Sequence, residues 1–310
     1  MEQTNRKIDE IIKVLSPYLH GKSRALRLAL ICFFSGGHLL IEDLPGLGKT
    51  TLAIGIAKAL GLSFGRIQST SDLLPTDITG LSMYNKNSGQ FEFHPGPVFS
   101  HIVLVDEINR ATPKTQSALL EAMGEKQVTV ESKTYTLRKP FFVIATQNPV
   151  EQFGTFPLPE SQLDRFMMKI GIGYPLRESE IEILKGGSRR EELYSVQSLM
   201  DKDEVIGMQQ SIRNEIYVSD SILDYILGIV EATRKNRYLV AGLSTRGALA
   251  ITATAKTNAY FSERDFVIPE DIKELAEYTM PHRVIFREEY ERLDKKEIIR
   301  TAIEEIPVPA

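Results

Sequence analysis

A glycine-rich loop that ends in a lysine and two threonines is the first feature of this sequence that could do chemistry. It lies between the short apolar run 39–41 and a segment with helical periodicity, which is the context that a phosphate-binding loop requires. Its glycines let successive backbone N–H groups turn toward one anion, and the amino end of the helix adds partial positive charge. Lys49 would neutralise the β- and γ-phosphates of a nucleotide, and Thr50 would be a magnesium ligand. The predicted nucleotide-binding residues are Pro45, Gly46, Leu47, Gly48, Lys49, Thr50 and Thr51.

Asp43 departs from the general pattern of such loops, G-x-x-x-x-G-K-[ST], which has glycine at this position. A carboxylate directed at the phosphates would repel them. Because Asp43 lies at the end of the predicted strand, we expect its side chain to face away while Gly46 and Gly48 form the cradle. The alternative interpretation of the whole loop is a tight strand-to-helix turn with a surface lysine.

An acidic pair, Asp106 and Glu107, follows the apolar run 102–105 directly. Ligands gather at the carboxyl ends of strands in open α/β sheets, so both side chains are expected near the phosphate loop. Asp106 would hold magnesium together with Thr50, and Glu107 would polarise a water for in-line attack on the γ-phosphate. A strand that ends in Asp-Glu is often only a solvated turn. Combined with the loop around Lys49, the pair predicts hydrolysis of a nucleoside triphosphate.

Continuous apolar runs predict the element that positions these residues. Such runs indicate strands buried on both faces, and therefore a parallel sheet covered by helices. Beyond Pro175 the strand signal disappears and helical periodicity dominates. We therefore predict an α/β core over residues 1–175, with inserted hairpins at 82–95 and 128–137, and a helical domain over 176–310. The runs are 39–41, 102–105, 141–144 and the alternating segment 166–172.

Composition excludes several classes of protein. The 310 residues carry a formal net charge of −4, which does not fit a general nucleic-acid binder. No apolar stretch is long enough to cross a bilayer, and the amino-terminal residues lack the apolar core of a signal peptide. The single cysteine, Cys32, fits a reducing cytoplasm. The five histidines and this cysteine show no metal-ligand spacing.

The linked motifs resemble those of the MoxR group of AAA+ ATPases, and the resemblance extends from about residue 19 to residue 283. It implies a P-loop core whose five-stranded parallel sheet is sandwiched by helices, followed by a smaller all-helical lid domain. ATP and Mg²⁺ would be the cofactors. The working form would be a ring, expected to be a hexamer, that acts on a client protein, often one with a von Willebrand factor A domain. The matching segments are 45–50, 106–111, 145–149 and 158–166.

The resemblance also implies roles for three further residues. Asn148 would be sensor 1, hydrogen-bonding the γ-phosphate or the attacking water; alternatively it is a cap before Pro149. Arg165 would be the arginine finger that a neighbouring subunit inserts against the γ-phosphate, with a helix-end cation as the alternative. Arg246 would be sensor 2. Arg246 follows the expected N-cap Ser244 within the first helical turn, where its positive charge opposes the helix dipole at a cost of about 0.3–1 kcal/mol. A phosphate at the domain junction would offset this cost. A solvated arginine is the alternative.

ATP hydrolysis that drives remodelling or maturation of a client protein is the function we predict. A nucleic-acid translocase or a magnesium-chelatase-like motor is the main alternative, because these proteins share hairpin insertions. The hairpin tip 84–90 carries only one charge, on Lys86, which argues against translocation. A P-loop kinase or GTPase is disfavoured by the helical domain with Arg246 and by the finger candidate Arg165, and an ATP-gated scaffold by Glu107.

Overall fold

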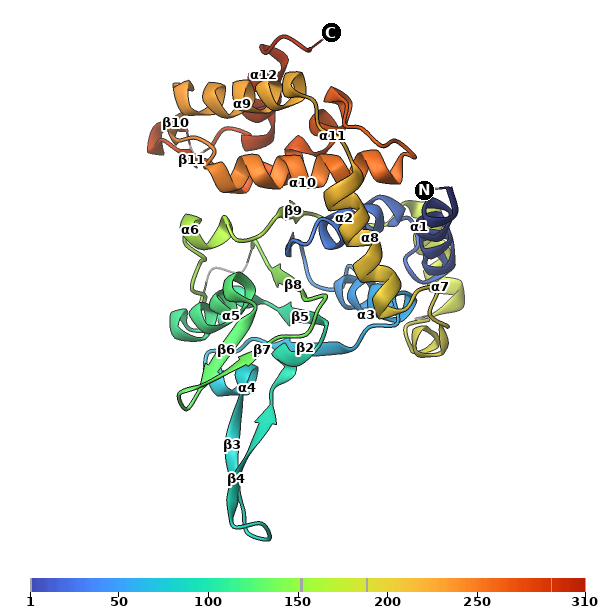
Figure 1. Ribbon diagram of the computed structural model, residues 1–310, viewed down its shortest axis with the longest axis vertical. Coiled ribbons are helices and arrows are strands. Elements are labelled where there is room, and N and C mark those ends of the chain that lie inside the picture. Colours follow the sequence, from blue (N-terminus) through green and yellow to red (C-terminus); the bar gives the residue numbers. More distant parts are fainter. Residues whose placement is uncertain (1, 151–152, 188, 291, 310) are drawn as a thin grey trace.

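A five-stranded parallel sheet forms the centre of the computed structural model, which describes residues 2–150, 153–187, 189–290 and 292–309 (Figure 1). Its order is β2-β5-β8-β1-β9, and every neighbouring pair is parallel. The expected α/β fold with a five-stranded parallel sheet is therefore confirmed. The strands are β1 (Leu39–Glu42), β2 (Phe64–Gln68), β5 (Ile102–Asp106), β8 (Phe142–Gln147) and β9 (Met168–Ile170).

Alternating side chains of the central strands enter two separate cores. Ile102 and Leu104 of β5 pack with the helices on one face, whereas Val103 and Val105 pack with those on the other. The central strands β1, β5 and β8 are therefore apolar at successive positions, as expected for a sheet covered on both sides. On the first face lie α1 (Glu2–Leu15), α2 (Ser23–Phe34) and α3 (Lys49–Ala59), and on the second lie α4 (Pro75–Thr79) and α5 (Pro113–Glu125).

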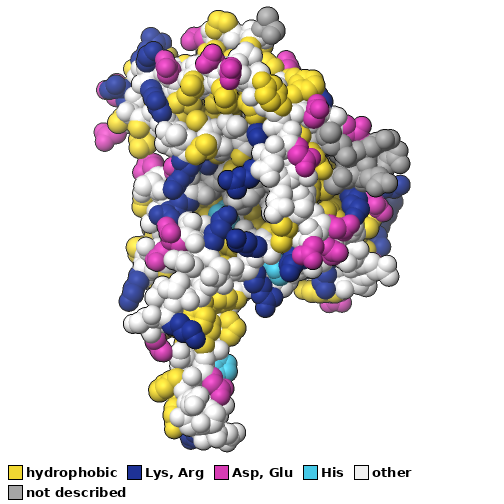
Figure 2. Space-filling model, viewed as in Figure 1, with side chains coloured by type: hydrophobic (Ala, Val, Ile, Leu, Met, Phe, Trp, Pro, Cys, Tyr) yellow, Lys and Arg dark blue, Asp and Glu magenta, His cyan; other side chains and the backbone are white. Residues whose placement is uncertain are grey.

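Two antiparallel hairpins are inserted in the core, close to where the sequence predicts them. The first pairs β3 (Gly80–Asn85) with β4 (Gln90–Pro95), and the second pairs β6 (Gln127–Val130) with β7 (Lys133–Thr136). The β3–β4 hairpin projects from the body of the molecule (Figure 1), and apolar side chains are visible along it (Figure 2). Its exposed side chains include Leu81, Met83, Tyr84 and Phe91.

Beyond β9 the chain first returns to the core. Leu199 donates a backbone hydrogen bond to Ala59 at 2.8 Å, and the Gln209 side chain donates to the Phe33 carbonyl at 2.8 Å. The division at residue 175 stays a prediction, since the segment up to α8 (Lys202–Glu215) packs on core helices. Before α8 come α7 (Arg177–Gly186), none of whose residues is buried, and the short helix η4 (Glu191–Ser195). In the described part of the chain, no helix combines the length and apolar character needed to cross a membrane.

Among the described residues, the lid contains four further α-helices, two short 3-10 helices and one short strand pair. Its α10 contacts α2, and its α11 contacts β9, so it packs directly on the core. The antiparallel pair β10–β11 was not predicted, and the expectation of an all-helical lid is incomplete to that extent. The elements are α9 (Asp220–Lys235), β10 (Leu239–Ala241), α10 (Thr245–Phe261), α11 (Pro269–Thr279), β11 (Ile285–Phe286) and α12 (Lys295–Glu304). The remaining short helices are η1 (Ser16–Tyr18), η2 (Pro97–Phe99), η3 (Ile108–Arg110), α6 (Glu160–Leu163), η5 (Pro281–Arg283) and η6 (Glu288–Tyr290).

Two buried histidines lie close to the edge of the sheet where β1 and β9 begin. His38 accepts from the Val143 N–H at its Nδ1 (3.0 Å) and donates from Nε2 to the Met123 carbonyl (3.3 Å). His282 donates from Nε2 to the Phe166 carbonyl at 2.9 Å. Burial lowers the pKa of His38 to about 4 and that of His282 to about 3. Both imidazoles are therefore neutral in the folded protein near neutral pH.

This burial predicts loss of stability in mild acid. Because the folded-state pKa values lie below the unfolded value of about 6.5, the unfolded chain binds more protons below that pH. Each neutral histidine contributes to the free energy of unfolding above pH 6.5, and this contribution is lost as the pH falls toward 3–4. At pH 5 the loss is about 2 kcal/mol for each histidine. Urea unfolding at pH 7.5 and 5.0 measures the loss. The variant His282→Gln should lose less stability between these pH values, and an unchanged difference would contradict the assignment.

Candidate nucleotide-binding site

The phosphate loop adopts the open form that its glycines allow. Gly46 and Gly48 have φ angles of +84° and +92°, which side-chain-bearing residues rarely adopt. A Cβ added at either residue would meet no atom within 4 Å, so the space above both glycines is open. The loop connects β1 to the amino end of α3, where Lys49 begins the helix. This geometry fits phosphate oxygens held by backbone N–H groups and the helix dipole.

Lys49 lies close to three acidic residues, Asp43, Asp106 and Glu107. Its ammonium donates to the Asp43 carbonyl. Burial lowers the pKa of Lys49, while the negative charges of Asp43, Asp106 and Glu107 act in the opposite direction. The structure thus brings together the lysine of the loop and the acidic pair at the end of β5.

The Asp43 carboxylate binds the chain beyond β9. Its Oδ2 accepts from the backbone N–H groups of Ile172 (2.7 Å) and Gly173 (2.6 Å), and its Oδ1 accepts from Leu44 (3.0 Å). The Lys22 ammonium donates to the carbonyls of Ile172 and Gly173. This arrangement agrees with the expectation that the side chain faces away from the phosphates. It also explains the missing glycine, because the carboxylate joins the start of the loop to the far strand.

The acidic pair is held by side chains from the neighbouring strands. Asp106 accepts from Arg66 Nε at 2.8 Å, and its other oxygen lies 3.5 Å from the Thr146 hydroxyl. Glu107 has a left-handed backbone (φ +56°), which lets two successive residues at the strand end serve one site. Its N–H donates to Thr146 Oγ1 at 2.9 Å, and its carboxylate accepts from Arg110 at 3.1 Å.

Sequence reasoning missed Arg66 and Thr146, and it also missed Gln68, whose amide lies 3.5 Å from the Glu107 carboxylate. Arg66 and Gln68 belong to β2, which was not predicted as a strand. In β2 the two polar residues are two positions apart and share one side of the strand. That alternation is the signal that could have located them.

The residues present fit magnesium and ATP. The Thr50 hydroxyl and the Asp106 carboxylate are oxygen donors of the kind that magnesium prefers. Among the described residues, no group of three histidine, cysteine, aspartate or glutamate side chains could hold a metal alone. Phosphate oxygens of a bound nucleotide would have to complete the coordination, as is usual for magnesium.

Asn148 follows β8, the strand between β5 and β1, so it lies at the edge that carries the loop and the acidic pair. Its Oδ1 accepts from the Val150 N–H at 3.2 Å. This contact is the capping role that sequence analysis offered as the alternative. A sensor role at this position stays a prediction.

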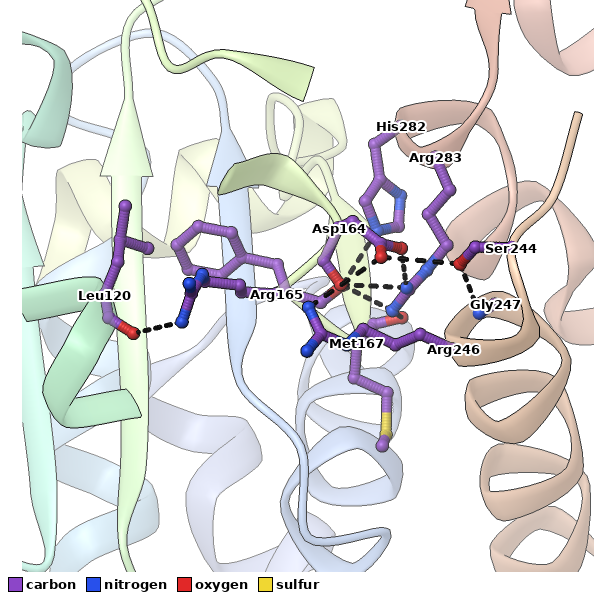
Figure 3. A network of polar contacts seen from close by, with 10 residues as sticks. Leu120, Asp164, Arg165, Met167, Ser244, Arg246, Gly247, His282 and Arg283 are labelled. Carbon is purple, nitrogen blue, oxygen red and sulfur yellow. Dashed lines mark hydrogen bonds and ion pairs between the residues drawn. The ribbon is translucent and has the colours of Figure 1, made fainter. Parts of the chain in front are cut away.

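The two predicted arginines lie at the opposite edge of the sheet. Leu39 pairs with Met168 in the parallel β1–β9 ladder, so residues just before Met168 lie where β1 begins, whereas the loop lies where β1 ends. β1 has four residues, which places the edges about 13 Å apart. Arg165 donates to the Leu120 carbonyl at 2.9 Å, and Arg246 lies 3.8 Å from the Asp164 carboxylate (Figure 3). In this chain the Asp164 carboxylate is the negative charge beside Arg246, and a sensor role for Arg246 stays a prediction.

Comparison with known proteins agrees with this fold and site. Residues 38–168 match the model of the ATPase family associated with various cellular activities (AAA), and residues 231–302 match the AAA lid domain. A structure described as a candidate ATPase from Cytophaga hutchinsonii superposes with a TM-score of 0.92 at 43% identity, covering 99% of this chain and 96% of that one. The protein is thus an AAA+ ATPase by fold and sequence.

The relatives define the group more narrowly. The uncharacterized protein YeaC of Bacillus subtilis is 42% identical over 99% of this chain and 97% of its own length. Chaperone MoxR1 of Mycobacterium tuberculosis is 38% identical over 86% of this chain and 72% of its own length. The chain belongs to the MoxR-type AAA+ ATPases.

Replacing Lys49 and Glu107 should separate binding from hydrolysis. Lys49→Ala should weaken ATP binding at least about tenfold, because the lysine contacts ground-state phosphates. Glu107→Gln should leave ATP binding intact and slow hydrolysis by about 10²-fold or more, because it removes the group that activates water. Equilibrium titration and single-turnover hydrolysis measure the two effects, with Lys58→Ala in the same helix as the control. Wild-type turnover by Glu107→Gln would show that another group is the base.

Replacing Asp43 should affect stability more than nucleotide affinity. Asp43→Gly should change ATP affinity less than about tenfold, because the carboxylate points at the chain beyond β9. It should lower the free energy of unfolding by about 1–3 kcal/mol, because backbone donors lose their acceptor. ATP titration and urea unfolding test both. A much larger gain in affinity would mean that the carboxylate opposes the phosphates.

Proposed function

We propose that this protein hydrolyses ATP at a site completed by a second copy of the chain and uses that reaction to remodel or mature a client protein. The observation that carries the proposal is the separation of charges between the two edges of the sheet. The loop, the acidic pair and Asn148 lie at the carboxyl edge, and Arg165 and Arg246 lie near the amino edge. In the structure of one copy, the two arginines therefore lie at the edge away from the loop.

The catalytic roles are divided between one copy and its neighbour. Backbone N–H groups of residues 45–51 and the ammonium of Lys49 bind the phosphates. Thr50 and Asp106 would hold magnesium, which would supply positive charge against the phosphate oxygens. Glu107 takes a proton from the attacking water, and Asn148 orients that water or the γ-phosphate. Arg165 and Arg246 of the neighbouring copy stabilise the charge that develops on the γ-phosphate.

The assembly proposed is a ring, expected to be a hexamer, located in the cytoplasm. A client protein is favoured over a nucleic acid by the β3–β4 hairpin, which exposes the large apolar side chains of Leu81, Met83, Tyr84 and Phe91, the last at 70% exposure, and whose tip carries a single lysine, Lys86. A phosphate backbone would call for lysines and arginines there. The name of the relative Chaperone MoxR1 supports action on a client protein. A client with a von Willebrand factor A domain is what the family resemblance implies.

Mixing two inactive variants tests the shared site. Arg165→Ala lacks the finger, and Glu107→Gln lacks the base, so each alone should hydrolyse ATP at least about 10²-fold more slowly than wild type. At a mixed contact, the base of the first variant can meet the finger of the second. With random pairing in an equal mixture, about a quarter of the sites should recover, because each site needs both correct neighbours.

Steady-state hydrolysis across mixing ratios measures the recovery, and mass measurement of the assemblies shows whether the copies have mixed. Lys49→Ala mixed with Glu107→Gln is the control, because both lesions lie on the nucleotide side and no site can recover. No recovery in mixed assemblies, or full activity from isolated Arg165→Ala monomers, would remove the proposal.

A further inference from the structure

The carboxylate of Asp164 joins the core to the lid. Asp164 follows α6, immediately before Arg165 and β9. Its Oδ1 accepts from the Arg283 guanidinium, and its Oδ2 lies 3.4 Å from the Ser244 hydroxyl and 3.8 Å from Arg246. Figure 3 shows these lid residues on one side of Asp164, with Arg165 extending to the other side.

The contact between Asp164 and Arg283 is buried and is supported by further hydrogen bonds of Arg283. Its side chain is only 2% exposed, and it also donates to the carbonyls of Asp164 (2.9 Å) and Phe166 (2.7 Å). Burial lowers the pKa of Arg283, and the Asp164 carboxylate opposes that shift. A buried cation needs such a partner, because its hydration is lost. The core segment around Asp164 is therefore held to η5 of the lid.

The second oxygen of Asp164 faces the amino end of α10. Ser244 caps this helix by accepting from the Gly247 N–H at 3.1 Å. Arg246 lies in the first turn of the helix, where a positive charge opposes the helix dipole. The Asp164 carboxylate lies 3.8 Å from the Arg246 guanidinium and supplies the compensating negative charge.

Arg165 is fixed on the other side. One guanidinium nitrogen donates to the Leu120 carbonyl of α5. A Cβ placed on Gly124 would come within 2.7 Å of the same nitrogen, so the side chain lies directly over that glycine. Two cations from different parts of the chain are thus held on either side of one carboxylate.

We propose that Asp164 is a positioning residue that fixes Arg165 of the core and Arg246 of the lid relative to each other, so that both act together on a second copy's triphosphate. This inference rests on the proposed function. It assigns Asp164 to the side of the chain that serves a neighbour, and not to the side that binds its own nucleotide. Its loss should therefore damage a neighbour's site and leave the chain's own loop intact.

The variant Asp164→Asn tests this assignment. It should bind ATP within about threefold of wild type, while kcat falls at least about tenfold. Mixed with Glu107→Gln, it should recover as well as Arg165→Ala does, because the Glu107→Gln copy supplies an intact arginine pair. Mixed with Arg165→Ala, it should not recover, because both lesions lie on the same side. Asp224→Asn, an exposed residue of α9, is the matched control and should behave as wild type.

Each contrary outcome counts against the inference. Failure of Asp164→Asn to recover with Glu107→Gln, or recovery with Arg165→Ala, would overturn it while the recovery of Arg165→Ala with Glu107→Gln still supports the proposed function. If the mixture of Arg165→Ala with Glu107→Gln also shows no recovery, the proposed function and the inference about Asp164 are both wrong. Should Asp164→Asn not fold, Asp164→Glu keeps the charge and moves it by one methylene. It should show the same pattern of recovery, and wild-type kcat in a folded Asp164→Glu would also overturn the inference.

Discussion

The common direction of the five strands is the constraint on which the arrangement of charges depends. In a parallel sheet, every residue that follows a strand lies at one edge, and every residue that precedes a strand lies at the other. The loop at 43–50, the acidic pair and Asn148 all follow strands. Asp164 and Arg165 come just before β9, and the lid docks there through His282 and Arg283. Chain order thus decides which charged groups can share a site.

Each cation described near the two edges has a partner in the same chain. Lys49 donates to the Asp43 carbonyl, Arg66 pairs with Asp106, and Arg246 lies against Asp164. A triphosphate that binds among such groups exchanges existing partners and does not meet bare charges, so the gain from each new contact is reduced by the contact it replaces. This exchange favours ligands with several oxygens in a fixed geometry, such as a nucleotide with magnesium.

The sequence allowed prediction of the sheet and of one half of the site. Continuous apolar runs identified β1, β5 and β8 because these strands are buried on both faces, and the residues that follow them located the loop and the acidic pair. The strand β2 escaped because Gly65 and Arg66 interrupt it and only Ile67 is buried. Its residues Arg66 and Gln68, which contact the acidic pair, were therefore missed.

Long-range contacts account for the remaining differences. The role of Asp43 depends on Ile172 and Gly173, about 130 residues away, and nothing local indicates that pairing. For Arg246 the helix-dipole argument indicated that its charge needs compensation. It could not indicate the partner, because Asp164 comes from the core and is brought to α10 only by the docking of the lid. The pair β10–β11 is too short to give a pattern.

The position of the arginines at one edge and the phosphate loop at the other restricts the symmetry of any assembly that joins them. Such a contact joins two different groups of residues. A two-fold dimer can make it only if both groups lie within one self-complementary patch, so that the arginines of each copy reach the loop of the other. If the two groups lie on separate surfaces, the contact is heterologous, and repeating it gives an open row or a closed ring. In an open row, the first copy presents a loop that no arginine reaches, and the last presents arginines with no loop to serve. Of these two arrangements, only closure into a ring gives every copy the same surroundings, and so makes every site equivalent.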